Sequence, residues 1–217
     1  MMKICGWTLR DVFRMYASSL FAGICISIGC TVNLMIGGGI TGACLFTFGL
    51  IAVVHYGYKL YTGTAGFIHS WGDFLMLFGY ILVGNFFGCW LMADLMSVSL
   101  PGISEAAYHI AQSRTFITWP QALIRGIFCG FLMTTAVKFA RANKWLPLLF
   151  AVPVFILAGF YHSIADAFYL LCANHFKPVD FMACNYLVIV LGNFIGCNIH
   201  RIVEKKYETE NKNKDLS

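Results

Sequence analysis

Three polar side chains that could do chemistry stand inside one strongly apolar run of this sequence. The run reads GFYHSIADAF over residues 159–168 and contains His162, Ser163 and Asp166. Burying a polar group without a hydrogen-bond partner costs roughly 2–7 kcal/mol, and ionisable residues inside membrane segments mark ion paths and proton relays. Histidine has an unperturbed pKa of about 6.5, so it can exchange a proton near neutral pH. The run therefore predicts a functional site with His162 as its proton source.

The elements that must position these side chains are membrane helices. Of the 217 residues, 59% are hydrophobic and 12% are charged, and the mean hydropathy is +0.73. A soluble domain carries about 25% charged residues. Most of the apolar segments reach the ~20 residues that cross a bilayer. There are six of them, at roughly 18–36, 40–56, 74–97, 119–140, 145–161 and 181–203. We predict an all-α membrane protein with six transmembrane helices in one channel domain, residues 18–203.

Two of the six segments do not read as single spans. The second runs into HYGYKLYTGTAGF at residues 55–67, and the fifth runs into the polar site. Both are short apolar stretches that glycine and polar side chains interrupt. Broken helices occur at membrane depth only where protein or a water-filled cavity satisfies the freed backbone groups. The second and fifth spans are therefore predicted to be broken helices.

The two halves of the chain repeat each other. FAGIC at residues 21–25 resembles IRGIFC at 124–129, and GNFFG at 84–88 resembles GNFIG at 192–196. Between them, the break with Thr62-Gly63 corresponds to the break with His162-Ser163. Because each copy has three spans, an odd number, the second copy enters the membrane upside down. The sequence therefore predicts an inverted 3+3 repeat with a substrate path at the interface between the copies.

The two ends of the chain are predicted to lie outside the membrane core. Residues 1–17 place Trp7, Phe13 and Tyr16 on one helical face, which indicates a cytoplasmic amphipathic segment on the membrane surface; a disordered lead-in is the alternative. This segment has no apolar core followed by a small-residue cleavage site, so it is not a signal peptide. Residues 204–217 mix charges of both signs without periodicity, which predicts a disordered cytoplasmic tail.

Basic residues set the orientation. One side of the predicted bundle holds Lys3, Arg10, Arg14, Lys138, Arg141, Lys144, Arg201, Lys205, Lys206, Lys212 and Lys214. The other side has Arg114, Arg125 and Lys177. Because cytoplasmic loops carry the excess of lysine and arginine, both termini are predicted to be cytoplasmic. The expected location is a prokaryotic plasma (inner) membrane, crossed several times.

Five stretches carry a resemblance to a known family. In order along residues 18–203, they read FGLIAVVHYGYKLYTG, GNFFGCWLMA, RGIFCGFLMTTAVKFA, GFYHSIADAF and LGNFIGC. They resemble the successive signatures of the formate–nitrite transporter family, and the LYTG turn and the GFxHS break are the most specific. The resemblance implies an aquaporin-like bundle that assembles as a homopentamer with one pore per protomer. It also implies passage of small monovalent anions or their acids, such as formate, nitrite, hydrosulfide, acetate and lactate.

The resemblance also implies roles for individual residues. Thr62 corresponds to the threonine of the loop that breaks the second span, and His162 to the pore histidine that it faces. Arg114 stands where the family usually has a lysine near the outer vestibule. Positions of apolar constrictions or further pore-lining residues are occupied by Phe46, Leu50, Tyr61, Phe155 and Met133.

Four positions depart from the family pattern. Tyr161 replaces the usual glutamate, Gly130 the usual asparagine and Asp166 an asparagine, and Lys59 stands where an acidic residue is common. These departures leave open which anion is transported. Formate is the first prediction and nitrite the second; hydrosulfide and short-chain carboxylates are the alternatives.

A mechanism follows from elementary electrostatics. A bare anion in an apolar constriction costs many kcal/mol, whereas a neutral acid does not. A pore therefore needs cations that gather anions, donors that hold or protonate them, and narrow apolar rings that exclude water and larger ions. Arg114 is the candidate collector, Thr62 the neutral donor and His162 the proton source, with Ser163 beside it.

Each of these residues also has a structural interpretation. A buried histidine can be a plain hydrogen-bonding group, Thr62 a hydroxyl that bends a helix, and Arg114 a solvated interfacial residue. Asp166 stands four residues after His162 and can be a structural partner rather than a substrate group. The glycines in the GNFFG and GNFIG stretches permit close helix packing.

Other classes of protein are disfavoured. A membrane redox protein with a histidine-ligated cofactor needs paired ligands, but the six histidines are scattered, and Cys197-x-x-His200 is a single half-site. The nine cysteines contain no C-x-x-C. A hydrolase would need Ser163 to face His162, and adjacent helical residues do not face each other. No enzyme activity, cofactor, metal or nucleic-acid partner is predicted; the expected partners are small anions, lipid and further copies of the chain.

Overall fold

The computed structural model describes the backbone of residues 3–4 and 7–214 and the side chains of residues 8–201. A short antiparallel pair, β1 (Lys3–Ile4) and β2 (Trp7–Thr8), precedes the first helix, α1 (Leu9–Met35). Thr8 caps α1, because its side chain accepts from the backbone N–H of Asp11 while the Asp11 carboxylate accepts from the backbone N–H of Thr8. Residues 9–17, expected as a separate surface segment, are thus the first turns of α1.

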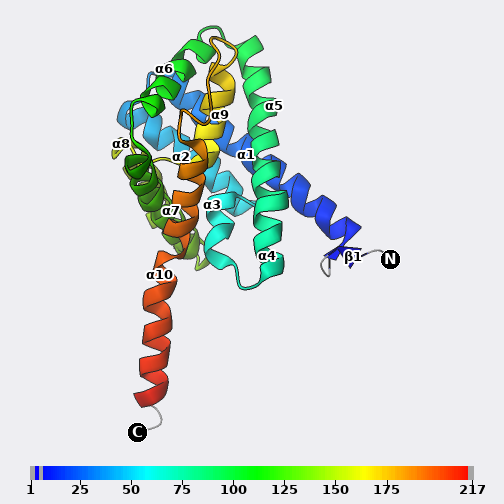
Figure 1. Ribbon diagram of the computed structural model, residues 1–217, viewed down its shortest axis with the longest axis vertical. Helices are drawn as coiled ribbons and strands as arrows, with labels where there is room; N and C mark the ends of the chain where they lie inside the picture. The colour runs from blue at the N-terminus through cyan, green and yellow to red at the C-terminus, as the bar shows by residue number, and fades with distance from the viewer. Residues whose placement is uncertain (1–2, 5–6, 215–217) are drawn as a thin grey trace.

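The remaining elements are helices arranged as one bundle (Figure 1). In chain order they are α2 (Gly39–His55), α3 (Tyr61–Thr64), η1 (Ala65–Phe67), α4 (Trp71–Met76), η2 (Leu77–Leu82), α5 (Val83–Ser99), α6 (Ile103–Thr115), α7 (Trp119–Arg141), α8 (Leu146–Leu157), α9 (Ser163–Ala173) and α10 (Tyr186–Lys214). In Figure 1 the first turn of α1 and the last turn of α10 lie toward the same end, opposite the α5–α6 turn.

Several helices have the length and composition of membrane spans. Among the described residues, three are long and apolar enough to cross a bilayer: Leu9–Met35, Trp71–Ser99 and Trp119–Arg141. The shorter apolar helices are Gly39–His55, Leu146–Leu157 and Ser163–Ala173. The short helices are those of the second and fifth predicted spans, where the chain is interrupted.

Packing between helices follows the predicted repeat. α1 packs along α5 and α2, and α7 packs in the same way along α10 and α8. Glycines allow the close approach, because a Cβ atom at Gly88 would overlap the carbonyl oxygen of Leu20, and one at Gly196 that of Ile127.

The glycine contacts correct one detail of the repeat. A Cβ atom at Gly23 would overlap the carbonyl oxygen of Asn85, and one at Gly130 would overlap that of Asn193. Gly23 is therefore equivalent to Gly130 in packing, although the short sequence motifs matched it with Gly126. The similarity of the motifs is local, whereas the contact with the partner helix fixes the true register.

Both interrupted helices end in the same way. α2 and α8 each finish in a Schellman motif with a glycine of positive φ, Gly57 (φ 70°) and Gly159 (φ 68°). The backbone N–H of the next residue bonds back into the helix, from Tyr58 to Val53 over 2.9 Å and from Phe160 to Phe155 over 2.9 Å. After each of these glycines the chain runs in extended conformation, into α3 in the first repeat and into α9 in the second.

An asparagine holds each break open. Asn85 accepts from the N–H of Tyr61 (2.7 Å) and donates to the carbonyls of Ser19 (2.7 Å) and Lys59 (2.9 Å). Asn193 accepts from the N–H of Ser163 (2.8 Å) and donates to the carbonyls of Gly126 and Tyr161, both 2.8 Å away. Each amide thus replaces hydrogen bonds that the interrupted helix lost. The two amides bracket one residue each, Leu60 and His162.

The C-terminal part of the chain differs from the expectation of disorder. α10 continues as helix to Lys214 and extends beyond the bundle (Figure 1). The charge pattern that suggested disorder is rich in glutamate and lysine, and both residue types favour helix. Residues 215–217 lie outside the described part.

Candidate pore site

His162 and Thr62 meet at the centre of the bundle, one from each repeat. The Nε2 atom of His162 lies 2.9 Å from the Oγ1 atom of Thr62. His162 is 2% exposed and Thr62 is 0% exposed, so water does not reach the pair directly. The structure therefore brings together the two residues that the sequence had assigned to facing breaks.

The hydrogen bonds of His162 assign its tautomer. His162 is the N-cap of α9, and its Nδ1 atom accepts the backbone N–H of Ala165 over 3.1 Å. A nitrogen that accepts a hydrogen bond carries no proton, so the ring proton of the neutral imidazole is on Nε2 and is donated to Thr62. A second proton on Nδ1 would face the Ala165 N–H. The geometry thus favours a neutral histidine that acts as a hydrogen-bond donor.

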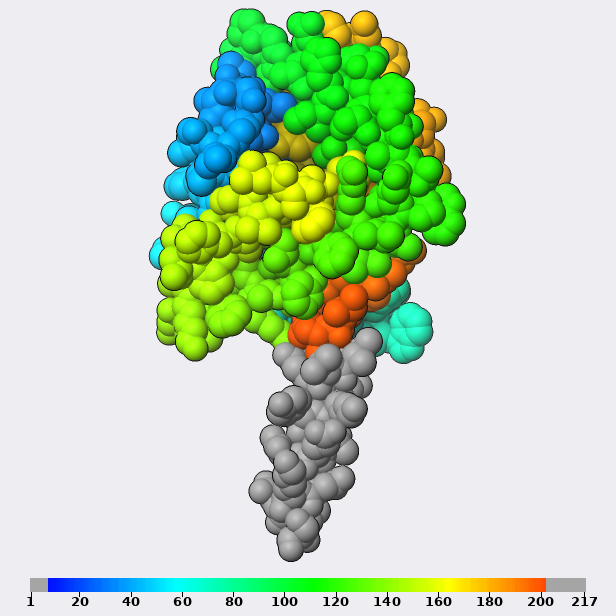
Figure 2. Space-filling view, turned by 90° about the vertical axis from the view of Figure 1, so that its left-hand side faces the viewer, coloured from blue at the N-terminus to red at the C-terminus, as the bar shows by residue number. Residues whose placement is uncertain are grey.

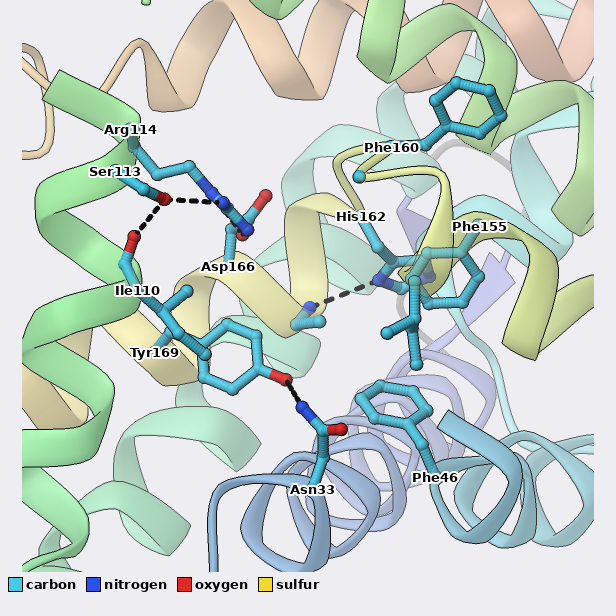
Figure 3. Close-up of a pocket in the computed structure, with 13 residues that line it drawn as sticks. Asn33, Phe46, Ile110, Ser113, Arg114, Phe155, Phe160, His162, Asp166 and Tyr169 are labelled. Carbon is cyan, nitrogen blue, oxygen red and sulfur yellow. Dashed lines mark hydrogen bonds and ion pairs between the residues drawn. The ribbon is translucent and has the colours of Figure 1, made fainter. Parts of the chain in front are cut away.

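A cavity of about 200 Å³ opens on one side of His162. We call it the outer cavity, after the orientation that the basic residues predict. The helices α1, α2, α6, α8 and α9 and the break before α9 contribute to its wall. Figure 2 shows the hollow between the blue, green and yellow segments, and Figure 3 shows the side chains around it. The wall includes the side chains of Asn33, Phe46, Arg114, Phe155, His162, Asp166 and Tyr169.

Two phenylalanines line the outer cavity beside His162. The rings of Phe46 and Phe155 meet edge to face with centroids 5.9 Å apart. The ring of Phe155 also stacks on the imidazole of His162 at 5.7 Å (Figure 3). The polar pair is thus flanked by apolar rings.

Arg114 and Asp166 form an ion pair in the wall of the outer cavity. The Nε and Nη2 atoms of Arg114 lie 3.1 and 2.8 Å from Oδ1 of Asp166. The Asp166 side chain is 2% exposed and that of Arg114 is 15% exposed. The Nη1 atom of Arg114 donates to the Ser113 hydroxyl over 3.0 Å. The guanidinium is therefore held by α9 and its own helix, α6.

Tyr161 lies between two arginines. The guanidinium carbon of Arg114 is 4.0 Å from the centre of the Tyr161 ring, and that of Arg125 is 5.1 Å from it. Arg125 also donates from Nη1 to the Tyr161 hydroxyl over 2.7 Å. The neutral ring accepts both cations through cation–π contacts, so Asp166 supplies the negative charge of this cluster.

A second cavity, of about 60 Å³, is lined by residues of the break before α3. We call it the inner cavity. Leu60, Val53 and Gly63 line it together with Lys59 and Arg141. Arg141 stacks on the ring of Phe67 at 4.0 Å and donates to the carbonyl of Gly63 over 3.5 Å. None of the residues that line this cavity is a carboxylate.

One apolar stripe of α2 connects the two cavities. Phe46 lines the outer cavity, Val53 lines the inner one, and Leu50 is buried between them on the same helical face. Met133, 1% exposed on α7, stands one turn before Val137, which lines the inner cavity. These side chains form the dry section around the His162–Thr62 pair.

Two of the predicted site residues, Tyr61 and Ser163, line neither cavity. Tyr61 is buried with its hydroxyl donating to the carbonyl of Val190 (3.0 Å) and its ring against Phe78, whereas its neighbour Leu60 lines the inner cavity. Ser163 is fully buried; its backbone N–H bonds to Asn193 and its hydroxyl has no hydrogen-bond partner among the described residues.

Sequence reasoning missed Asn85, Asn193, Leu60 and Arg141. The two asparagines stand in the repeated Gly-Asn stretches, in which a structural role was predicted for the glycines only. A polar amide repeated inside two apolar spans was the signal that could have identified them. Leu60 carried no such signal.

Comparisons with known proteins agree with this architecture. The family model described as "Formate/nitrite transporter" matches residues 8–203. A formate-nitrite transporter of Entamoeba histolytica is 25% identical over 217 residues, which cover 85% of this chain and 61% of that protein. The formate channel FocB of Escherichia coli is 23% identical, with 88% of this chain and 80% of that protein covered.

Solved structures share the fold. A pentameric formate channel with formate bound superposes with a TM-score of 0.82 at 20% identity, covering 94% of this chain and 99% of that one. An ion channel of the FNT family gives a TM-score of 0.83 at 19% identity, covering 92% and 91% of the two chains.

Proposed function

This chain belongs to the formate/nitrite transporter family, and on that premise we propose that it is a channel for small monovalent anions or their neutral acids. Formate is the first candidate substrate and nitrite the second; hydrosulfide and short-chain carboxylates are the alternatives. The named functions of FocB and of the pentameric formate channel support this order.

The observation that carries the proposal is the arrangement of two cavities around one buried polar pair. The outer cavity ends at His162 and the inner cavity begins at Leu60 and Gly63, with Thr62 between them. A species that passes must leave water, cross apolar side chains and meet two hydrogen-bond donors. The same dry section excludes an ion of higher charge because its desolvation costs more, and an ion of larger size because it does not fit between the apolar side chains.

The roles of the pair follow from its hydrogen bonds. In our proposal, the Nε2–H group of His162 and the hydroxyl of Thr62 turn from each other to the oxygen atoms of the passing species. His162 stays neutral because Ala165 occupies Nδ1. The proton that makes the species neutral therefore travels with it rather than coming from the imidazole. Ser163 supports the break through its backbone, and Phe46, Leu50, Phe155 and Met133 keep the path dry.

The proposed assembly is a homopentamer with one path per protomer, in a prokaryotic plasma membrane with both termini in the cytoplasm. Large apolar side chains on the outside of the bundle support contact with lipid and neighbouring protomers; Val98 is 89% exposed and Phe150 is 62% exposed. Native mass spectrometry in mild detergent should give pentamers. Monomers or dimers alone would contradict the assembly.

The direct test is uptake into proteoliposomes. Purified protein is reconstituted, and uptake of formate, nitrite and hydrosulfide is compared side by side with empty liposomes and with a His162→Phe variant of equal assembly. We expect wild-type protein to move formate fastest and the variant to move none. No uptake of any of the three by wild-type protein would refute the proposed function.

A further inference from the structure

The charges that line the outer cavity cancel each other. Arg114 and Asp166 are the formally charged residues of its lining, and they are paired over 2.8 Å. The inner cavity differs, since Lys59 and Arg141 line it and no carboxylate does. A cavity with a cancelled charge offers an anion little attraction, whereas one with two cations attracts it.

We propose that Asp166 determines which form of the substrate enters, because it neutralises Arg114 and leaves an outer cavity that takes the neutral acid rather than the anion. This rests on the proposed channel function and deepens it. Arg114, expected from the sequence to gather anions, is then a paired cation, and the inner cavity is the side that favours the anion. The acid HA crosses the dry section whole; in the inner cavity it separates into A⁻ and H⁺, and both leave on the inner side.

The surroundings of Asp166 support a charge balance set by Arg114 alone. The other titratable groups that interact with its charge are Cys30 on α1, Cys129 on α7, Tyr169 on α9, and Cys184 and Tyr186 near the start of α10. Thiols and phenols are neutral at pH 7 at their ordinary pKa values. His162 in the cavity wall is neutral by its hydrogen bonds, and Arg125 reaches the cluster only through Tyr161.

Hydrogen-bonding capacity points the same way. Arg114 uses Nε and Nη2 on Asp166 and Nη1 on Ser113, which leaves few donors for an anion. Oδ2 of Asp166 has no hydrogen-bond partner among the described residues, and neither has Oδ1 of Asn33, another residue of the cavity wall. Both oxygens are buried in the wall, and their negative partial charge favours the O–H group of a neutral acid nearby over an anion.

The test changes the charge and keeps the shape. Asp166→Asn retains the Oδ1 acceptor for Arg114 and places an amide where Oδ2 has no partner, so the variant should assemble. Initial uptake of formate is measured from the outer side in oriented proteoliposomes, across formate concentration, pH and ionic strength. Wild-type uptake should follow the concentration of formic acid and change little with salt.

In Asp166→Asn, the uncompensated Arg114 should concentrate the anion. We expect KM for total formate at neutral pH to fall about fivefold at low ionic strength, and the gain to disappear at high ionic strength, because salt screens the charge. The double variant Arg114→Gln/Asp166→Asn is neutral again and should regain salt-independent uptake. Asp94→Asn is the matched control: it removes one carboxylate from an exposed pair with His175 on the same protein, and it should leave KM unchanged.

The outcomes separate the two claims. If Asp166→Asn fails to assemble, Arg114→Gln alone is measured. It leaves an unpaired carboxylate, which repels the anion and not the neutral acid, so uptake should still follow formic acid and stay independent of salt. A KM for total formate that rises at low salt would show that the anion enters, and would overturn the inference. Wild-type uptake that follows the anion and slows with salt would overturn the inference. So would an assembled Asp166→Asn variant whose KM and salt dependence match wild type. In either case the protein still takes up formate, so the proposed function stands. Wild-type protein that moves no substrate refutes the proposed function.

Discussion

The two breaks in this protein share a scaffold but differ in the residue that they present. Each follows a helix that ends at a glycine of positive φ, and an asparagine amide bridges each. The bracketed residue is Leu60 in the first repeat and His162 in the second. The scaffold therefore opens a path twice, and only the second copy places a polar side chain at the bracketed position. In the proposed function, the shared scaffold holds the path open and the bracketed residue selects the substrate.

The largest expected effect comes from removing the shared scaffold. Asn193→Ala leaves the N–H of Ser163 and the carbonyls of Gly126 and Tyr161 without partners, and Asn85→Ala does the same to three groups at the first break. Each unsatisfied buried group costs about 1–3 kcal/mol, so both variants should lose assembly. Thermal unfolding in detergent, followed by size-exclusion chromatography, measures this. If one variant melts like wild type, the two breaks are not equivalent.

The next largest effect comes from making the second break a copy of the first. His162→Leu places the residue type of position 60 at position 162 and removes the donor to the passing species. Loss of a hydrogen bond to a charged or strongly polar group costs about 1.5–3 kcal/mol, so formate uptake should fall roughly 10–100-fold while assembly is retained. The readout is uptake at matched protein content. Unimpaired uptake would mean that His162 serves packing alone.

A smaller effect is expected at the partner of His162. Thr62→Val keeps the shape of the side chain and removes its hydroxyl, which donates a neutral hydrogen bond worth about 0.5–1.5 kcal/mol. Formate uptake should fall about 2–10-fold, and Thr62→Ser should restore most of it because the hydroxyl returns. Unchanged uptake in Thr62→Val together with a loss in Thr62→Ser would point to packing of the threonine methyl group rather than to its hydroxyl.

Features of this structure that depend on local sequence could be predicted, and features that depend on long-range packing could not. The all-helical fold, the family and the meeting of Thr62 with His162 follow from apolar run lengths and from short motifs, which are local properties of the sequence. The ion pair between Arg114 and Asp166 joins residues 52 positions apart on α6 and α9. Nothing local indicates it, because the distance between those helices is set by packing.

His162 also shows what residue types alone cannot predict. Its type and position indicated a titrating proton source, because the imidazole pKa lies near neutral pH. The role proposed for it, as a neutral donor, depends on the backbone N–H of Ala165, three residues later, which donates to Nδ1. An N-cap contact is a matter of backbone geometry that residue types alone do not specify.

The central claim is that the substrate crosses as a neutral acid, held by a histidine that does not titrate. Its most direct test is uptake of formate against pH for wild type and for His162→Asn, with assembly matched. Asparagine keeps an N–H donor and removes the titratable ring. We predict that the variant is slower but keeps the wild-type pH profile, with uptake rising as pH falls in step with formic acid. A variant that transports formate with no dependence on pH would contradict the account and restore His162 as the proton source.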